Sequence, residues 1–211
     1  MGRYRPFRLC QRLYNDKGNG GTWKHKVSWS SRILDKYSEW YSYEEDLLGM
    51  GWCTHQKIVD VMKTIDDIDN LSKADIGCGT GLVGKEWGKK DIDGFDLVPT
   101  MCDLAQNSYA NMRMHNIEEE PLHKKYDVVI MCGTFTDYIL DASCLQNVSD
   151  SLEDDGVLIT SIPFNTDYFN TSGWSKQEVF KLDKETLPFN SWIPSDIGEQ
   201  KVHRICTWRK K

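Results

Sequence analysis

Four glycines crowd into eight positions of the segment KADIGCGTGLVGKEW, at Gly77, Gly79, Gly81 and Gly84. Glycine costs about 0.5–1 kcal/mol relative to alanine inside regular structure, so a cluster this dense needs a reason. The cluster follows a short expected strand and opens an expected helix over residues 82–90. A strand that turns through bare backbone into a helix predicts a sheet of strand–helix units, with a ligand lying against the loop.

The rest of the chain repeats this alternation of strands and helices. Val128, Val129, Ile130 and Met131 form an unbroken apolar run, which is typical of a strand buried on both faces of a parallel sheet. The pattern predicts an α/β fold: a doubly wound, mostly parallel seven-stranded sheet with helices on both faces. The expected strands are 74–77, 91–98, 109–117, 126–133, 156–163, 179–183 and 202–210, and the expected helices between them are 82–90, 99–107 and 141–152.

Charge divides the chain into two parts. Residues 1–32 carry eight lysines and arginines and one acid, a net charge of +7, whereas the whole chain carries −6. We therefore expect a basic N-terminal extension over 1–32 and a single domain over 33–211. The extension fits three roles: folding back onto the acidic body, which we favour, contacting nucleic acid, or acting as an organelle signal.

Composition favours a cytoplasmic protein. No apolar run approaches the roughly 18 residues of a membrane span, and no secretory apolar segment stands at the N-terminus. Seven cysteines at irregular spacing do not suggest a disulfide framework, and no His/Cys grouping has the spacing of metal ligands. We expect reduced thiols, no metal and no membrane partner, and we leave the oligomeric state and organelle targeting open.

The glycine loop and the strand after it together suggest a ribose-bearing cofactor. Gly79, Gly81 and Gly84 match the G-x-G-x-x-G dinucleotide fingerprint, and Asp96 ends the next expected strand, 19 residues after Gly77. These positions alone fit NAD as well as other nucleoside cofactors. Asp75 would repel a pyrophosphate at the mouth of the loop, and it would attract a cofactor that carries an ammonium or sulfonium group.

These segments resemble the motifs of class I S-adenosylmethionine-dependent methyltransferases. DIGCGTG in this chain resembles the first motif of that family, and GFDLVPTMCDLAQN resembles the second. MHNIEEEPL resembles the segment that borders adenine. The fourth and fifth strands are similar to YDVVIMCGTF and LEDDGVLITSIP. Upstream, YSEWYSYEEDLLGMGW resembles a helix of the methyltransferase-like subgroup encoded in the Williams–Beuren region. The resemblance covers about residues 37–164 and implies S-adenosylmethionine as the cofactor.

The resemblance also implies which residues bind the cofactor: Asp96 would bind the ribose hydroxyls and Leu97 would pack on adenine. Tyr37, Trp40 and Tyr41 have the spacing of one helix face, and in the resembling subgroup this helix closes over the cofactor as a lid. A helix packed on the core would give the same spacing. The full expected set is Asp75, Gly77, Cys78, Gly79, Gly81, Asp96, Leu97, Asn116, Ile117, Cys132, Tyr37 and Trp40.

The implied reaction is an in-line attack of an acceptor on the sulfonium methyl group, for which the protein aligns the acceptor and excludes water. We expect a small molecule or a flexible side chain as the acceptor. No NPPY-like segment follows the fourth strand, which disfavours methylation of a base nitrogen. A nicotinamide-dependent oxidoreductase and a non-catalytic cofactor-binding protein are the alternatives. The sequence names no catalytic residue; the candidates for substrate contacts are Thr134, Phe135, Asp137, Tyr138, Phe164 and Asn165.

Overall fold

The computed structural model describes residues 33–34, 37–38, 40–136, 139–164, 167–192 and 201–211. The basic extension at 1–32 and the substrate candidates Asp137, Tyr138 and Asn165 lie outside these residues. Of the helices in the described part, none is long and apolar enough to cross a membrane.

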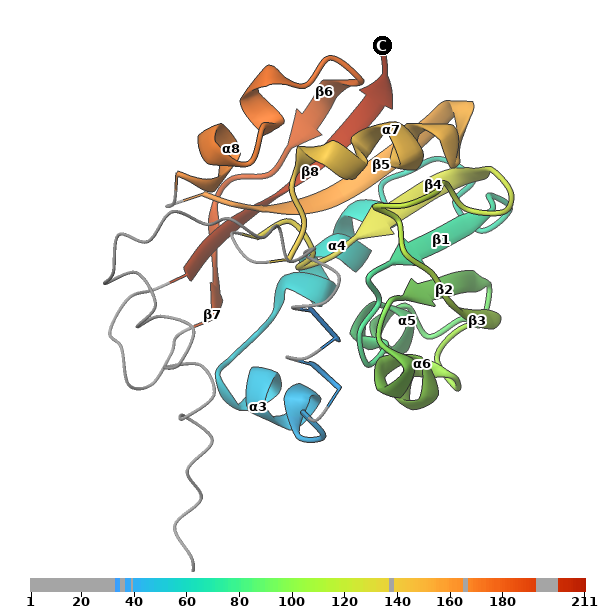
Figure 1. The fold of residues 1–211 in the computed structure, drawn as a ribbon, viewed down its shortest axis with the longest axis vertical. Coiled ribbons are helices and arrows are strands. Elements are labelled where there is room, and N and C mark those ends of the chain that lie inside the picture. The colour runs from blue at the N-terminus through green and yellow to red at the C-terminus, as the bar shows by residue number, and fades with distance from the viewer. Residues whose placement is uncertain (1–32, 35–36, 39, 137–138, 165–166, 193–200) are drawn as a thin grey trace, which may run out of the picture.

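One sheet of eight strands organises the described part of the chain (Figure 1). Its order is β3-β2-β1-β4-β5-β8-β6, and β7 pairs with β8. Strands β1 to β5 run parallel to one another, whereas β8 runs antiparallel to β5, β6 and β7. The strands are β1 (Lys73–Ile76), β2 (Ile92–Asp96), β3 (Asn111–Met114), β4 (Tyr126–Met131), β5 (Leu152–Pro163), β6 (Phe180–Glu185), β7 (Phe189–Trp192) and β8 (Lys201–Lys210).

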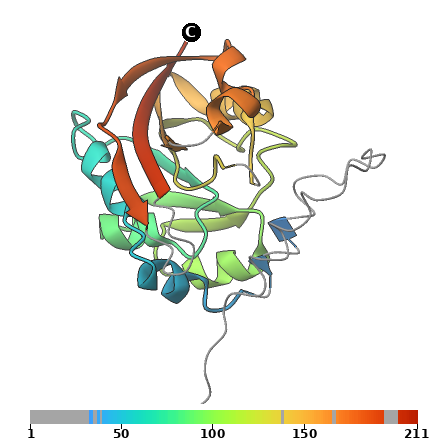
Figure 2. The ribbon, with the colours of Figure 1, turned by 90° about the vertical axis from the view of Figure 1, so that its left-hand side faces the viewer.

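The predicted fold class is confirmed, with one strand more than the seven expected. The addition is β7, a four-residue strand whose short length gave no clear periodic signal. Figure 2 views the molecule from the side of β7 and α8, where β6, β7 and β8 form the antiparallel part of the sheet.

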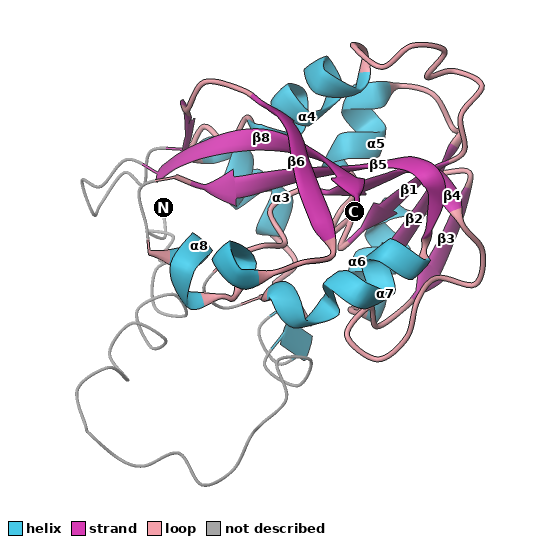
Figure 3. Ribbon diagram, turned by 90° about the horizontal axis from the view of Figure 1, so that it is seen from above, coloured by secondary structure: helices cyan, strands magenta, loops and turns pink. Residues whose placement is uncertain are grey.

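Helices cover both faces of the sheet (Figure 3). On one face, α4 and α5 pack with β1, β4 and β5 around a core that includes Ile58, Trp87 and Ile130. On the other face, α7 and α8 enclose a core that includes Tyr126 and Trp174. The helices are α3 (Tyr43–Gly49), α4 (Thr54–Met62), α5 (Leu82–Trp87), α6 (Pro99–Ala105), α7 (Leu145–Asp150) and α8 (Tyr168–Thr171).

A buried lysine stands at the start of β1. The side chain of Lys73 is 1% exposed, and its Nζ lies 3.1 Å from a carboxylate oxygen of Asp91. The same Nζ donates hydrogen bonds to the carbonyl oxygens of Ile68 at 2.9 Å and Leu71 at 2.7 Å. Burying a charge is costly unless it is paired and hydrogen-bonded, and these three oxygens meet that condition.

The expected helix face formed by Tyr37, Trp40 and Tyr41 is wrong. Trp40 and Tyr41 lie in a turn that ends where α3 begins, at Tyr43. The indole Nε1–H of Trp40 donates to the carboxylate of Asp46 at 2.7 Å, which ties this residue to α3. Tyr41 is 77% exposed, and Tyr43 takes its place beside Tyr37 and Trp40, with ring centroids 5.5 Å and 5.0 Å away.

Candidate functional site

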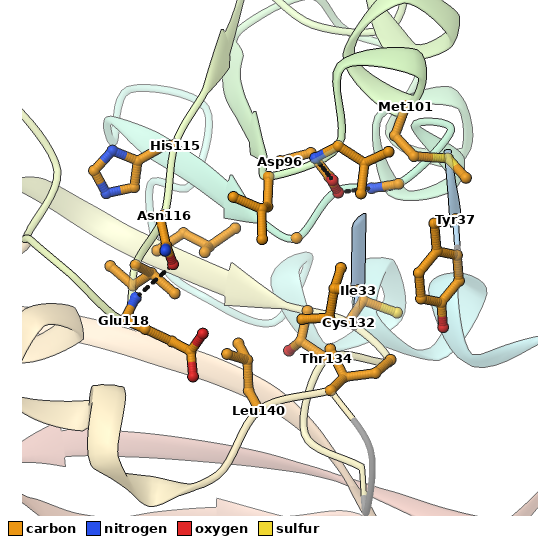
Figure 4. Close-up of a pocket in the computed structure, with 18 of the residues that line it drawn as sticks. Ile33, Tyr37, Asp96, Met101, His115, Asn116, Glu118, Cys132, Thr134 and Leu140 are labelled. Atoms are coloured by element: carbon orange, nitrogen blue, oxygen red, sulfur yellow. Dashed lines mark hydrogen bonds between the residues drawn. The ribbon is translucent and has the colours of Figure 1, made fainter. Parts of the chain in front are cut away.

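A cleft opens over the carboxyl ends of β1, β2 and β4 (Figure 4). Ile76 and Gly77 border it from β1, Asp96 from β2, and Cys132 and Gly133 from the residues after β4. Its empty space, including the open mouth, is about 690 Å³. Ligands of open α/β sheets bind in this position, because the loops after parallel strands gather at one edge of the sheet.

The glycine loop presents bare backbone to this cleft, and two of its glycines serve different ends. Gly77 and Gly79 have φ angles of +69° and +55°, a region that favours glycine. A Cβ on Gly77 would lie 2.3 Å from the Cγ2 atom of Thr134, so glycine is required there for packing. A Cβ on Gly79 would meet only the ring of Tyr43, at 3.8 Å, so the backbone at Gly79 faces open space.

Asp96 ties the glycine loop to the segment that begins α6. One carboxylate oxygen accepts a hydrogen bond from the backbone N–H of Gly79 at 2.8 Å, and the other accepts from that of Val98 at 2.9 Å. Burial raises the pKa of Asp96, and these hydrogen bonds oppose the rise. Each oxygen of a carboxylate has two acceptor positions, so Asp96 can also accept hydrogen bonds from ligand hydroxyls in the cleft.

Asp75 lies beneath the glycine loop, and our expectation that it stands at the mouth of the loop is wrong. It is fully buried, is not among the described residues that line the cleft, and accepts a hydrogen bond from the hydroxyl of Tyr109 at 2.6 Å. Its other oxygen is buried without a hydrogen-bond partner among the described residues. Burial raises the pKa of Asp75 to about 7, the bond from Tyr109 lowers it, and the charge of Asp96 raises it.

The charged residues around the cleft are acidic. Asp96 and Glu118 line it, and no lysine or arginine does so among the described residues. His115 is the one imidazole there among those residues, and its Nε2 lies 3.0 Å from the carbonyl oxygen of Glu120. This arrangement attracts a cationic ligand and repels a polyanion.

The sequence and the fold both match known methyltransferases. Residues 74–158 match the family model described as a methyltransferase domain. This stretch contains β1 to β4, the first half of β5 and the helices between them.

This part of the chain is similar to a methyltransferase domain.

A curated relative and several solved structures resemble the domain and its flanks. The malonyl-[acyl-carrier protein] O-methyltransferase of Acetivibrio thermocellus is 28% identical over 166 residues, which cover 72% of this chain and 56% of the relative. The chain thus spans little more than half the length of that relative.

Two solved structures show the same fold. The TehB-like SAM-dependent methyltransferase from Corynebacterium glutamicum has a TM-score of 0.59 at 16% identity, covering 84% of this chain and 100% of its own. The magnesium protoporphyrin IX methyltransferase from Synechocystis, solved with bound SAH, also has a TM-score of 0.59, at 14% identity, covering 86% and 99%.

Most of the residues expected at the cofactor site surround the cleft. Figure 4 shows Asn116 and Glu118 at one end and Tyr37 and Cys132 toward the other. The carbonyl oxygen of the Asn116 side chain accepts a hydrogen bond from the backbone N–H of Glu118 at 3.1 Å. The expected residues that line the cleft are Tyr37, Gly77, Gly79, Asp96, Leu97, Asn116, Ile117 and Cys132, together with the substrate candidate Thr134.

Three other expected cofactor-site residues turn away from the cleft. The sulfur of Cys78 lies 3.7 Å from that of Met112, in the core on the α4–α5 face. Gly81 is the N-cap of α5, where a Cβ would meet Ser108 at 3.0 Å, so its role is in packing. Trp40 packs behind Tyr37 and does not line the cleft.

Two substrate candidates also lie away from the cleft. Phe135 is fully buried, with its ring 4.8 Å from that of Trp174 in a T-shaped contact, so it belongs to the core. Phe164 is 49% exposed and does not line the cleft, and the guanidinium of Arg204 lies over its ring at 5.5 Å.

The structure adds cleft residues that the sequence analysis did not single out. Tyr43 reaches into the cleft, where burial and then the neighbouring Tyr37 and Asp96 raise its pKa well above the ordinary value. Its place beside Tyr37 and Trp40 in an aromatic-rich segment was the available signal. The other additions are Ile33, Ile76, Val98, Met101, His115, Glu118, Gly133, Ile139 and Leu140.

Proposed function

We propose that this chain transfers methyl groups from S-adenosylmethionine to a small molecule or a flexible side chain. The observation that carries the proposal is the charge of the cleft: bare backbone at Gly79 beside the carboxylates of Asp96 and Glu118, without a lysine or arginine among the described lining residues. A pyrophosphate would find no cation there, which disfavours a nicotinamide dinucleotide. A sulfonium cofactor carries the charge that this surface attracts.

The residues present fit this cofactor part by part. Asp96 offers acceptors for ribose hydroxyls, and Leu97 and Ile117 offer apolar surface to adenine. Asn116 supplies a side-chain amide at the edge of the same space. One oxygen of Asp75 is buried beneath the loop without a hydrogen-bond partner among the described residues, and it would carry negative charge when the carboxyl group ionises. When bound, S-adenosylmethionine supplies a methyl group that its sulfonium already activates, so the protein chiefly has to orient the acceptor and exclude water.

The segment before α4, from Ile33 to the end of α3, borders the cleft and can exclude water from it. Tyr37 and Tyr43 line the cleft from this segment, and Ile33 packs against Val98 and Met101 at the start of α6. We propose that this segment is a lid. The rings of Tyr37, Trp40 and Tyr43 form an aromatic cluster in this segment. We propose on this basis that the chain belongs to the methyltransferase-like subgroup encoded in the Williams–Beuren region.

The acceptor class rests on two observations. The relative from Acetivibrio thermocellus is named as a malonyl-[acyl-carrier protein] O-methyltransferase, which supports an oxygen atom as the methyl acceptor here. Its malonyl group carries a carboxylate, so the likeness extends to the oxygen acceptor and not to the charge of the substrate. The residues after β4 leave space beside the cofactor cleft that suits a small molecule. A cytoplasmic location and a small-molecule partner remain part of this proposal, as does a role for the basic extension at residues 1–32.

The test compares cofactors directly. Titration of the full chain, followed by tryptophan fluorescence, should show saturable binding of S-adenosylmethionine and S-adenosylhomocysteine and none of NADH. Incubation with S-adenosylmethionine and a metabolite panel should then release S-adenosylhomocysteine with at least one acceptor. Binding of NADH alone would overturn the proposal, and cofactor binding without turnover across a broad panel would favour a non-catalytic binding protein.

A further inference from the structure

A second hollow adjoins the cofactor cleft. It lies between the residues that follow β4 and the helix that follows β5, and its empty space, including the mouth, is about 460 Å³. Ile139 and Leu140 line both spaces, so the two share a wall. An acceptor held in the hollow would therefore lie next to whatever occupies the cleft.

Hydrogen bonds fix the two sides of this hollow to each other. The hydroxyl of Tyr168, a fully buried residue on α8, donates to the carbonyl oxygen of Leu140 at 2.5 Å. The backbone N–H of Ala142 donates to the carbonyl oxygen of Ser172 at 2.9 Å. Because both bonds join one wall segment to the other, the walls are held in place before a ligand arrives, and preorganised walls lower the cost of binding.

The lining of the hollow is polar and carries negative charge. Thr136, Thr171 and Ser172 line it, and Asp141 contributes the one charged side chain among the described lining residues. The hydroxyl of Thr171 donates to the carbonyl oxygen of Asp167 at 3.0 Å, and the hydroxyl oxygen of Ser172 is buried. One carboxylate oxygen of Asp141 accepts a hydrogen bond from the backbone N–H of Ser143 at 2.8 Å, which fixes the side chain. A carboxylate offers about four acceptor positions, so this bond leaves Asp141 able to bind a ligand.

Taken with the acidic cofactor cleft, this chemistry selects against anions. A carboxylate on the acceptor would meet Asp141 in the hollow and Asp96 in the cleft, whereas an ammonium group would meet acceptors only. On the basis of the proposed function, we infer that the hollow between the residues after β4 and α8 binds an ammonium group of the methyl acceptor, with the carboxylate of Asp141 as its counter-charge. The acceptor class is then a small hydroxylated amine.

The probes that test this are ethanolamine and glycolate, which have similar size and opposite charge. Each is titrated into the full chain by ligand-observed NMR, with and without saturating S-adenosylhomocysteine, whose own binding is followed by tryptophan fluorescence. Ethanolamine should bind the wild-type chain and glycolate should not. Asp141→Asn retains a side-chain oxygen for the Ser143 bond and should weaken ethanolamine binding about threefold or more.

Two further variants control for structural effects. Asp141→Glu keeps the charge and should restore part of the ethanolamine affinity, whereas Asp103→Asn, on the exposed face of α6, should leave it unchanged. Tighter binding of glycolate, or equal ethanolamine affinity in wild type and Asp141→Asn, would overturn the inference while leaving the cofactor proposal intact. Failure of S-adenosylhomocysteine to bind would overturn the proposed function. The ethanolamine titration in the absence of S-adenosylhomocysteine would still show whether the hollow binds an ammonium group.

Discussion

The backbone N–H of Gly79 donates to the carboxylate of Asp96 at 2.8 Å, so the loop after β1 and the end of β2 form one unit. The two residues are 17 positions apart, and the parallel register of Ile76 opposite Phe95 brings their segments together. Asp96 thereby has two roles at once: it holds the loop in shape, and it presents acceptors to the cleft.

Replacing Asp96 should therefore weaken cofactor binding more than a lost contact alone would. Asp96→Asn keeps the volume of the side chain but places an NH₂ group against the N–H of either Gly79 or Val98. We expect S-adenosylhomocysteine affinity to fall by roughly 1.5–3 kcal/mol, about 10- to 150-fold in Kd. Calorimetric titration measures this. Asp103→Asn is the matched control, and an unchanged Kd in Asp96→Asn would remove Asp96 from the site.

Gly79 should be sensitive to a single added methyl group. Gly79→Ala strains a residue at φ +55°, which costs about 1–2 kcal/mol, and puts its Cβ into the open cleft. Gly88→Ala is the matched control, because Gly88 has φ +74° and equally open surroundings away from the cleft. Both variants should lose similar stability in urea, but only Gly79→Ala should lose cofactor affinity, by about tenfold or more. Equal affinities in the two variants would mean that the cofactor does not approach this backbone.

The segment before α4 should be ordered by the cofactor. The residues of α3 are half-buried or exposed, with the ring of Tyr43 turned into the cleft, and the helix is held to α5 by an ion pair between Glu44 and Lys85. Elements with so little buried surface open readily. Hydrogen exchange over residues 40–50 should slow when S-adenosylhomocysteine binds, and Tyr43→Ala should reduce affinity while Tyr41→Ala, at a 77% exposed position, should not. Equal exchange in both states would make the segment a fixed part of the core.

The charge of Asp75 should make cofactor binding depend on pH. With a pKa of about 7, Asp75 is largely protonated in the free protein below neutrality. A sulfonium above the loop favours the ionised form, so binding should release a proton, and affinity should rise as pH increases through about 7. The groups that face Asp75 are Tyr109, Asp96, Cys78 and Cys132.

S-adenosylhomocysteine lacks the sulfonium charge, so it separates this effect from others. Its affinity should change less over the same pH range, and Asp75→Asn should give both ligands the same pH profile. Titrations in two buffers of different ionisation enthalpy measure the proton release. Parallel profiles for the two ligands in the wild-type chain would contradict the prediction.

His203 should make the fold less stable in acid. The residue is 5% exposed, its Nδ1 lies 2.6 Å from the hydroxyl oxygen of Ser191, and Trp52 packs against the ring at 5.8 Å. Burial lowers its pKa from the ordinary 6.5 to about 4, with a smaller effect from Lys201. The unfolded chain thus binds a proton between those pH values that the folded chain does not, so stability is present above pH 6.5 and is lost as the pH falls.

The size of this effect follows from the shift. The lowered pKa of His203 corresponds to a loss of about 3 kcal/mol in the free energy of unfolding, and the His203→Gln variant should not show this loss. Urea unfolding at pH 7 and pH 4.5 measures the loss in each protein. If wild type and His203→Gln lose the same stability between these values, His203 is not responsible.

Local patterns in the sequence were sufficient for the strand–loop–helix unit and for Asp96. The apolar run in β4 and the glycines before α5 are short-range signals, and a parallel sheet then places Asp96 beside Gly79. Side-chain directions were not predictable in the same way. Cys78 sits in the correct loop but turns into the core, because the positive φ angles on either side of it set its orientation.

The aromatic segment shows the same limit. Tyr37, Trp40 and Tyr41 have the spacing of a helix face. In the structure, however, the indole of Trp40 donates a hydrogen bond to Asp46, and the chain makes a turn before α3 begins. Such bonds between side chains depend on the folded arrangement, which spacing alone does not contain. Phe135 is a further case, since its burial against Trp174 joins segments almost forty residues apart.

The rate at which the amine of Lys73 reacts with an acylating reagent would report opening of the sheet. Its amine is enclosed by Asp91 and two backbone carbonyls at the start of β1, so an amine-acylating reagent cannot reach it in the folded chain. Lys57, whose side chain is 47% exposed, would be labelled at once. The slow rate at which Lys73 acquires label would then report how often β1 separates from its neighbours, residue-resolved and without denaturant.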